Sequence, residues 1–177
     1  MREPGERLQL SPGMPEQFDD MSASSRQKLH ILIVENDPAA VHLTKEAFRE
    51  AGLTEAIMSV PDGEEALALL RRKGKYSEHP HPDLIFLDLH LPKKSGLEVL
   101  AEIKEHPKLK ITPIVVVSGS ANPREVREAY QLHASCYIRK PDDLFEFLQF
   151  IKICYEFWGT VVTLPSKPEP ELAGERN

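Results

Sequence analysis

The sequence predicts an α/β protein built as a (βα)₅ doubly wound parallel sheet. Short, nearly continuous apolar runs rich in β-branched residues recur along the chain, and each is followed by a stretch with helical spacing of apolar residues. No two strand-like runs follow each other without such a stretch between them. This alternation favours a parallel sheet that is covered by helices on both faces and joined by right-handed crossovers.

The first two units occupy the segment up to about residue 73. Strands are expected at 29–35 (LHILIVE) and 56–60 (AIMSV). Asp37 is a suitable N-cap for the helix after the first strand, with Pro38 at its first position and an end near Gly52. Asp62 is the expected N-cap of the next helix (GEEALALLRRK), whose alanines and leucines recur at helical spacing.

The last three units follow the same rule. A third strand is expected at 84–87 (LIFL), followed by a helix over 95–106 (SGLEVLAEIKEH). A fourth strand at 112–117 (TPIVVV) precedes a helix capped by Asn122, with Pro123 at its start. A short fifth strand at 136–138 (CYI) leads into a long final helix from Asp142 to about Trp158.

The flanking segments differ in character from this core. Residues 1–27 are rich in Pro, Gly, Ser and charge without apolar periodicity, and are expected to be a disordered arm. Residues 28–158 are expected to form the folded domain, and 159–177 a C-terminal extension and tail.

Composition restricts the classes of partner and location. A net charge of −6 and the lack of a long basic run argue against nucleic acid or an anionic membrane as the main partner. No apolar run approaches the roughly 20 residues of a membrane span, and the amino terminus has no secretory signal. Two cysteines, Cys136 and Cys154, fit a reducing compartment, so we expect a cytoplasmic protein.

Functional side chains gather where the expected strands end. Glu35 and Asn36 follow the first strand, Asp88 the third, Ser118 the fourth and Lys140 the fifth. Because ligands bind at the carboxyl ends of the strands in such sheets, we expect these side chains to meet. Neighbouring carboxylates resist ionisation unless a cation offsets their charge, and an oxygen-only ligand set suits Mg²⁺.

A carboxylate beside Mg²⁺, an ammonium and a hydroxyl can carry out phosphoryl transfer. Asp88 would be the nucleophile and would form an aspartyl phosphate. Mg²⁺ and Lys140 would offset charge on the phosphoryl oxygens, and Ser118 would donate a hydrogen bond. Taken alone, Asp88 reads as a strand-end cap and Lys140 as a solvated lysine, and only their joint occurrence favours the phosphoryl-transfer interpretation.

The motifs LIVEND, IFLDLHLPKKSG, VVVSGS and YIRKP together resemble the receiver domain of two-component response regulators over about residues 28–158. The intervals from Asp88 to Ser118 and to Lys140 match the usual spacing of that family. The resemblance implies a flavodoxin-like receiver fold with strand order 2-1-3-4-5. It also implies a signalling protein rather than a metabolic enzyme, in which a partner sensor histidine kinase phosphorylates Asp88 and the signal passes through protein contacts.

The resemblance also assigns metal ligands. Glu35 and Asn36 take the acidic-pocket positions, Asp88 is both phosphoacceptor and ligand, and His90 would bind Mg²⁺ through its backbone carbonyl. The family usually has Asp where this chain has Asn36, so we expect weaker Mg²⁺ binding. Asp37 is a candidate to compensate through a water molecule.

Switch positions follow from the same resemblance. Ser118 and Tyr137 correspond to the family's hydroxyl and aromatic switch residues, although a half-buried aromatic on an edge strand is also an ordinary structural feature. The Lys140–Pro141 peptide resembles the family's cis bond. The pair His79 and His81 in HPHP reads as an exposed loop rather than a zinc site, because nothing nearby supplies further ligands.

Two further segments, KGKYSEHPHPD and YEFWGTVVTLP, resemble the small single-domain regulators paired with bacterial phytochrome kinases, which implies a bacteriophytochrome partner. The last helix is apolar around most of its circumference, so a second surface must cover it. We expect a homodimer in which the extension crosses over to the partner, or else coverage by the chain's own tail. The expected interface residues are Phe147, Ile151, Phe157 and Trp158.

Two rival functions stay open. A degenerate receiver would keep the fold and dimerise but phosphorylate weakly, because Asn36 removes a charge from the metal site. A phosphohydrolase would use Asp88 on external substrates, but such enzymes usually carry a second Asp two residues later, where this chain has His90.

Overall fold

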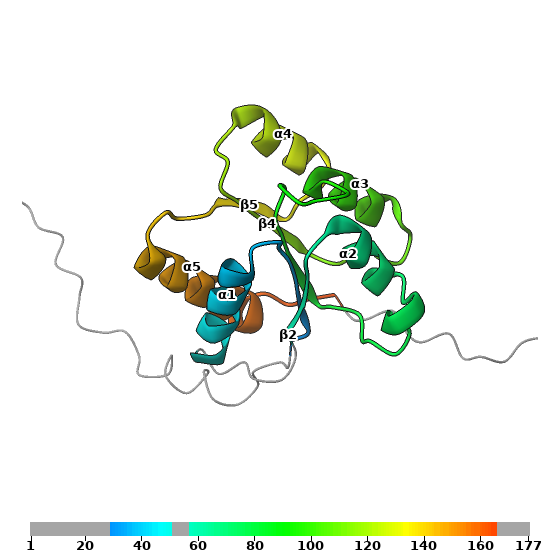
Figure 1. The fold of residues 1–177 in the computed structure, drawn as a ribbon, viewed down its shortest axis with the longest axis horizontal. Helices are drawn as coiled ribbons and strands as arrows, with labels where there is room; N and C mark the ends of the chain where they lie inside the picture. Colours follow the sequence, from blue (N-terminus) through cyan, green and yellow to red (C-terminus); the bar gives the residue numbers. More distant parts are fainter. Residues whose placement is uncertain (1–28, 51–56, 166–177) are drawn as a thin grey trace, which may run out of the picture.

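The computed structural model describes residues 29–50 and 57–165, and it confirms the predicted fold class (Figure 1). Five parallel strands form one sheet in the order β2-β1-β3-β4-β5. The strands are β1 (Ile31–Val34), β2 (Ile57–Val60), β3 (Leu84–Leu87), β4 (Ile114–Ser118) and β5 (Cys136–Arg139). The helices are α1 (Pro38–Glu50), α2 (Gly63–Leu70), α3 (Gly96–Glu105), α4 (Pro123–Gln131) and α5 (Leu144–Glu156), with a 3₁₀ turn η3 (Gly74–Tyr76) and a π-helical turn η4 (Phe157–Val161).

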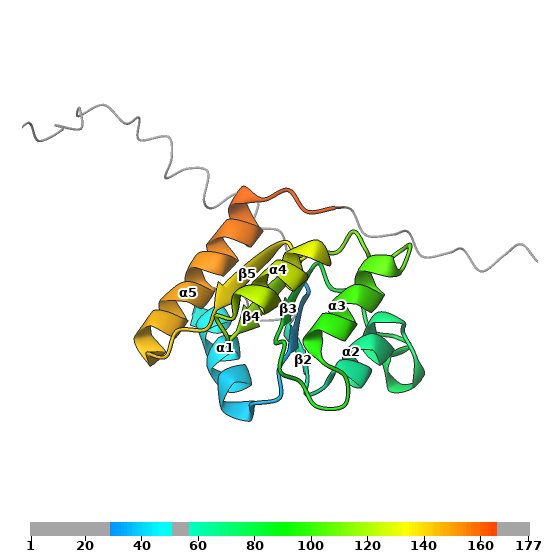
Figure 2. The ribbon, with the colours of Figure 1, turned by 90° about the horizontal axis from the view of Figure 1, so that it is seen from above.

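The sheet separates two apolar cores because successive strand residues point to opposite faces. In β1, Leu32 and Val34 pack in the core beneath α2, α3 and α4, while Ile31 and Ile33 pack in the core beneath α1 and α5. Figures 1 and 2 show α1 and α5 together on one face of the sheet. Every residue of β1, β3 and β4 is buried, so the three inner strands fix where the strand ends lie.

Helix starts follow the predicted caps. The Asp37 carboxylate accepts a hydrogen bond from the Ala39 N–H at 2.9 Å, and the Asp62 carboxylate accepts one from the Glu65 N–H at 2.8 Å. Asn122 caps α4 with Pro123 at its first position. The expected disordered arm at 1–27, the end of α1 near Gly52 and the last part of the tail lie outside the described residues.

The last helix corrects the expected dimer interface. Phe147 and Ile151 are buried in the subunit's own core beneath α1 and α5, 8% and 1% exposed, so they face the sheet and not a partner. The helical path also continues past Trp158 as the turn η4. Large apolar side chains exposed on this end of the molecule are instead Leu144, Phe145, Ile153, Phe157 and Val161.

Within the described residues, the extension after α5 packs against its own subunit. Leu164 is 8% exposed and belongs to the same apolar cluster as Leu29 at the start of β1, and Val162 packs against that cluster. The apolar side chains of this part of the extension therefore find cover on their own chain, and the crossing to a partner stays a prediction. Among the residues described, no helix is long and apolar enough to span a membrane.

Candidate functional site

The site is built where β1 and β3 end side by side. The Glu35 N–H donates to the Val60 carbonyl at 3.1 Å, and the Asp88 N–H donates to the Val34 carbonyl at 3.0 Å. Each carboxylate therefore leaves the sheet one residue after its strand, while its backbone is still held by the neighbouring strand. At the end of β5, the Lys140 N–H donates to the Ser118 carbonyl at 2.8 Å, which brings a third strand end to the same edge.

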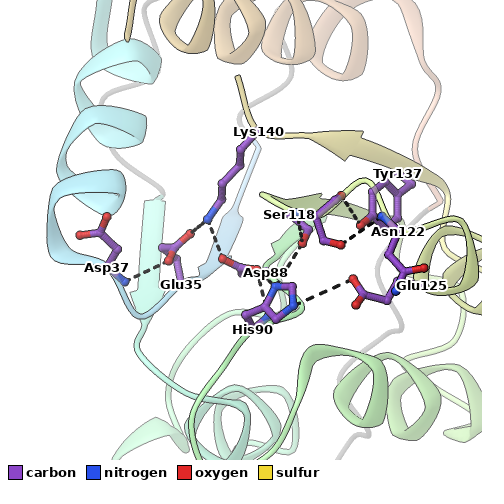
Figure 3. A network of polar contacts seen from close by, with 10 residues as sticks. Glu35, Asp37, Asp88, His90, Ser118, Asn122, Glu125, Tyr137 and Lys140 are labelled. Atoms are coloured by element: carbon purple, nitrogen blue, oxygen red, sulfur yellow. Dashed lines mark hydrogen bonds and ion pairs between the residues drawn. The ribbon is translucent and has the colours of Figure 1, made fainter. Parts of the chain in front are cut away.

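The Lys140 amine joins the two carboxylates (Figure 3). Its Nζ donates to Asp88 Oδ2 at 2.6 Å and also to Glu35 Oε2. The two carboxylate side chains are 9% and 8% exposed, whereas the lysine side chain is 21% exposed. Burial by itself lowers the pKa of Lys140, but hydrogen bonds and charge attraction from Asp88 and Glu35 outweigh burial, so its pKa is raised. The lysine is therefore held in its charged form.

The oxygen atoms at this edge fit Mg²⁺. Two carboxylates, Glu35 and Asp88, lie on one ammonium group, so they are close enough to share a cation. No cluster of three His, Cys, Asp or Glu side chains suited to a metal occurs within the described ranges. Mg²⁺ is commonly held by one or two carboxylates and keeps several waters, so Glu35 and Asp88 fit its requirements. Ligation by the Asn36 amide and the His90 carbonyl stays a prediction. Asn36 itself is exposed beside Glu35.

Ser118 and Tyr137 lie on the β4 and β5 side of the site. Ser118 is completely buried, and its Oγ accepts a hydrogen bond from the Ser120 N–H at 3.3 Å. Tyr137 is half-buried, and its hydroxyl donates to the Ser120 carbonyl at 2.8 Å. The loop after β4 thus contacts both predicted switch residues, one through its amide and one through its carbonyl.

Sequence reasoning missed two side chains at the site, the His90 imidazole and Glu125. The His90 Nδ1 lies 3.4 Å from Ser118 Oγ and 3.9 Å from Asp88 Oδ1, and Nε2 lies 4.0 Å from Glu125 Oε2. His90 was expected to contribute only its backbone carbonyl. Glu125 lies in the first turn of α4, and no sequence signal distinguishes it from an ordinary surface glutamate.

The Lys140–Pro141 peptide departs from the expectation. No cis peptide bond occurs within residues 29–50 and 57–165, so this bond is trans and the expected cis bond is wrong. The trans bond is compatible with the site, because Lys140 already reaches both carboxylates in this conformation.

Comparisons with known proteins agree with this geometry. Residues 31–152 match the family described as response regulator receiver domain. The response regulator Rcp1 of Synechocystis sp. is 40% identical over 146 residues, which cover 82% of this chain and 99% of Rcp1.

Solved structures show the same likeness. The phosphorylated cyanobacterial phytochrome response regulator RcpA is 44% identical with a TM-score of 0.77, over 79% of this chain and 100% of RcpA. The Mn²⁺-bound form of Rcp1 is 40% identical with a TM-score of 0.74, over 77% of this chain and 98% of that structure. The strand order, the strand-end cluster and these matches together show that the chain belongs to the response regulator receiver domain family.

Proposed function

We propose that this chain is a phospho-accepting response regulator in which Asp88 receives a phosphoryl group from the phosphohistidine of a sensor histidine kinase. One observation carries the proposal: the Lys140 amine holds Asp88 and Glu35 together at the strand ends, although the three residues come from distant parts of the sequence. Such a pre-formed arrangement of an ammonium beside a nucleophilic carboxylate is what phosphoryl transfer requires.

The residues act on a phosphoryl group as follows. An Asp88 oxygen attacks phosphorus while the bond from phosphorus to the kinase histidine nitrogen breaks, and the electron pair of that bond stays on the imidazole. Lys140 Nζ lies 2.6 Å from Asp88 Oδ2, so its ammonium group can also pair with the negative charge of the phosphoryl oxygens. Ser118 can donate its hydroxyl to a phosphoryl oxygen. Mg²⁺, held by Glu35, Asp88, Asn36 and the His90 carbonyl, would neutralise charge on the same oxygens.

A phytochrome kinase is the partner that we propose. Support comes from RcpA, which is a cyanobacterial phytochrome response regulator and is 44% identical to this chain. The exchange is proposed to take place in the cytoplasm, and the two free thiols of Cys136 and Cys154 support a reducing compartment.

Removing the acceptor carboxylate tests the proposal. Asp88→Asn should abolish phosphoryl incorporation from acetyl phosphate or a phytochrome kinase in the presence of Mg²⁺. Asp142→Asn is the matched control, because the Asp142 side chain is 95% exposed and pairs with Arg139 at 3.4 Å; it should label like the wild type. Labelling that persists in Asp88→Asn would refute the assignment.

We also propose a homodimer, with the exposed apolar side chains of α5 and η4 as its surface. Phe145, Ile153 and Phe157 recur at intervals of eight and four residues, so they share one stripe of the helix, and they are 68%, 63% and 48% exposed. An apolar stripe of this kind is typical of an interface.

Light scattering coupled to size-exclusion chromatography tests the homodimer. Ile153→Glu should shift the mass from two chains to one, whereas Lys152→Glu, on the neighbouring exposed position, should not. A wild-type chain that stays monomeric at high concentration would contradict the dimer.

A further inference from the structure

A cavity of about 330 Å³ opens between α1 and β2. Pockets that hold small molecules commonly measure about 300–1,000 Å³, so this volume is sufficient for a ligand. The helix contributes Val41, His42 and Lys45 to the lining, and the strand contributes Ser59 and Val60. Because β2 is an edge strand of the sheet, the cavity lies at the edge opposite β5.

Lys45 brings a positive charge into this cavity without a counter-ion. It is half-buried, and its ammonium group donates to Ser59 Oγ at 2.8 Å. Lys93 and Lys140 each pair with a carboxylate, whereas Lys45 has no carboxylate within ion-pair distance in the part of the chain that the structure describes. A partly buried ammonium group loses solvation by water, so an anion beside it is favourable.

The Ser59 hydroxyl has a hydrogen left for a ligand. Its oxygen accepts the hydrogen bond from Lys45, and no acceptor for its own O–H occurs among the described residues. The Lys45 ammonium donates one of its three hydrogens to Ser59 and keeps two. Three donors are therefore available at one corner of the cavity, which suits the three terminal oxygens of a phosphate monoester better than the two of a carboxylate.

The acidic end of the cavity does not cancel the charge of Lys45. Glu35 and Asn36 also line the cavity. The Glu35 carboxylate is paired with the Lys140 ammonium group, and it accepts the Asp37 N–H at 2.9 Å. Because Lys140 offsets the negative charge of Glu35, the positive charge of Lys45 is left to attract an anion.

The other walls suit the organic part of such a ligand. Val41 and Pro61 line the cavity with apolar side chains, against which a short carbon chain can pack. His42 lies three residues before Lys45, so both side chains share one face of α1, and the ring adds a polar group to the lining. A few polar groups among apolar walls are typical of small-molecule sites.

We propose that the cavity between α1 and β2 binds a small phosphate monoester. The phosphate group lies on the Lys45 ammonium and the Ser59 hydroxyl, and the carbon chain lies against Val41 and Pro61. Binding at this cavity requires no phosphoryl transfer, so the inference does not depend on the role of Asp88.

A titration of the full chain with glycerol 3-phosphate tests the inference. Backbone amide shifts are followed by two-dimensional ¹H–¹⁵N NMR in Mg²⁺-free buffer, and should saturate, with the largest changes in α1 and β2. Lys45→Met should weaken binding about tenfold or more, because it removes a hydrogen bond between charged groups. Lys45→Arg keeps the charge and should restore most of the affinity.

Ser59→Ala tests the same site without a change of charge. It removes one oxygen atom and should weaken binding several-fold, so it reports on the site even if Lys45→Met loses stability. Lys73→Met is the matched control, because Lys73 is exposed and lies outside the cavity lining, and it should bind like the wild type. Succinate, a dicarboxylate, should bind more weakly than glycerol 3-phosphate.

The outcomes also separate this cavity from the phosphoacceptor site. Asp88→Asn should bind glycerol 3-phosphate like the wild type. Tighter binding in Asp88→Asn together with unchanged binding in Lys45→Met would place the anion at Lys140 and overturn the inference. The absence of saturable shifts at tens of millimolar ligand, or a preference for succinate, would also overturn it, while the role of Asp88 in phosphoryl transfer would stay intact.

Discussion

Asn36 lies between two acidic residues, Glu35 and Asp37, and its side chain is exposed at the end of β1. The Asp37 N–H donates to Glu35 Oε1 at 2.9 Å, which ties the turn to the buried carboxylate. Asn36→Asp should therefore tighten Mg²⁺ binding about fivefold, because one more unit charge near a partly hydrated cation is worth on the order of 1 kcal/mol. Isothermal titration calorimetry with Mg²⁺ measures the change.

Asp37→Asn is the companion variant at this turn. A weaker Mg²⁺ affinity in this variant would show that Asp37 supplies the charge that Asn36 lacks, and an unchanged affinity would show that it does not. If Asn36→Asp bound Mg²⁺ no more tightly than the wild type, position 36 would have no part in metal binding.

The meeting of Asp88 and Lys140 could be anticipated from sequence, because apolar runs mark where buried strands end and parallel strands end at one edge. The His90 ring and Glu125 could not, since the direction of a loop side chain depends on backbone angles that no periodic pattern encodes. Glu125 also lies on a helix that carries three further charged residues, Arg124, Arg127 and Glu128, so it does not stand out from ordinary surface positions.

At the scale of elements, the start of α3 is packed directly against the acceptor loop. A Cβ on Gly96 would lie 2.1 Å from the Asp88 carbonyl oxygen and 2.6 Å from Leu89 Cα, which are backbone atoms. Gly96→Ala should lower the free energy of unfolding by about 2 kcal/mol or more, because the loop must shift as a unit. Urea unfolding measures this loss.

Gly119→Ala is the matched control, because its Cβ would meet nothing within 4 Å. The two variants should differ clearly in their urea midpoints. Equal stabilities of the two variants would show that the loop carrying Asp88 shifts away from α3 at little cost in free energy.

A second link joins the same loop to α2. Asp62 caps α2 and its Oδ2 lies 2.6 Å from Lys93 Nζ. Burial raises the pKa of Asp62, but the hydrogen bonds from Lys93 and from the Glu65 N–H outweigh burial, so its pKa lies below the ordinary 3.8. Because the folded pKa is depressed, this stabilisation is present above pH 3.8 and is lost as pH falls through the folded value.

Asp62→Asn keeps the cap and removes the ion pair with Lys93. Since Lys93 is half exposed, the variant should lose only a small part of its free energy of unfolding at pH 7. Between pH 4 and pH 2, the free energy of unfolding of Asp62→Asn should fall less than that of the wild type. Urea unfolding at each pH measures both. An identical acid loss in both proteins would contradict the depressed pKa.

The helix caps were predictable because Asp37, Asp62 and Asn122 each stand just before a periodic apolar stretch. The orientation of α5 was not, because a helix that is apolar around most of its circumference does not show which side faces the sheet. Phe147 and Ile151 were assigned to the interface for that reason, although they face the core.

At the scale of the whole molecule, the two ends of the described fold meet. Leu164 and Leu29 belong to one apolar cluster, so the extension after α5 completes the core beneath α1 and α5. Leu164→Ala should cost about 2–4 kcal/mol of unfolding free energy. Val161→Ala, at a side chain that is 71% exposed, should cost little. Urea unfolding compares the two, and equal stabilities would show that the extension is not part of the subunit's core in solution.

The global architecture was predictable because strand and helix patterns alternate without interruption and because crossovers in parallel sheets have one hand. The oligomeric state was harder to predict from the sequence, because an exposed apolar stripe shows that a surface is available but not what covers it. The path of the extension depended on tertiary packing with Leu29, which lies more than a hundred residues away in the sequence.

The most direct measurement is to locate the phosphoryl group itself. The chain is phosphorylated with acetyl phosphate and Mg²⁺, the acyl phosphate is trapped by borohydride reduction, and the modified residue is identified by mass spectrometry of peptides. We expect modification at Asp88 alone, with none in Asp88→Asn. Modification at another carboxylate, or no trapped product from a wild-type chain that binds Mg²⁺, would contradict it.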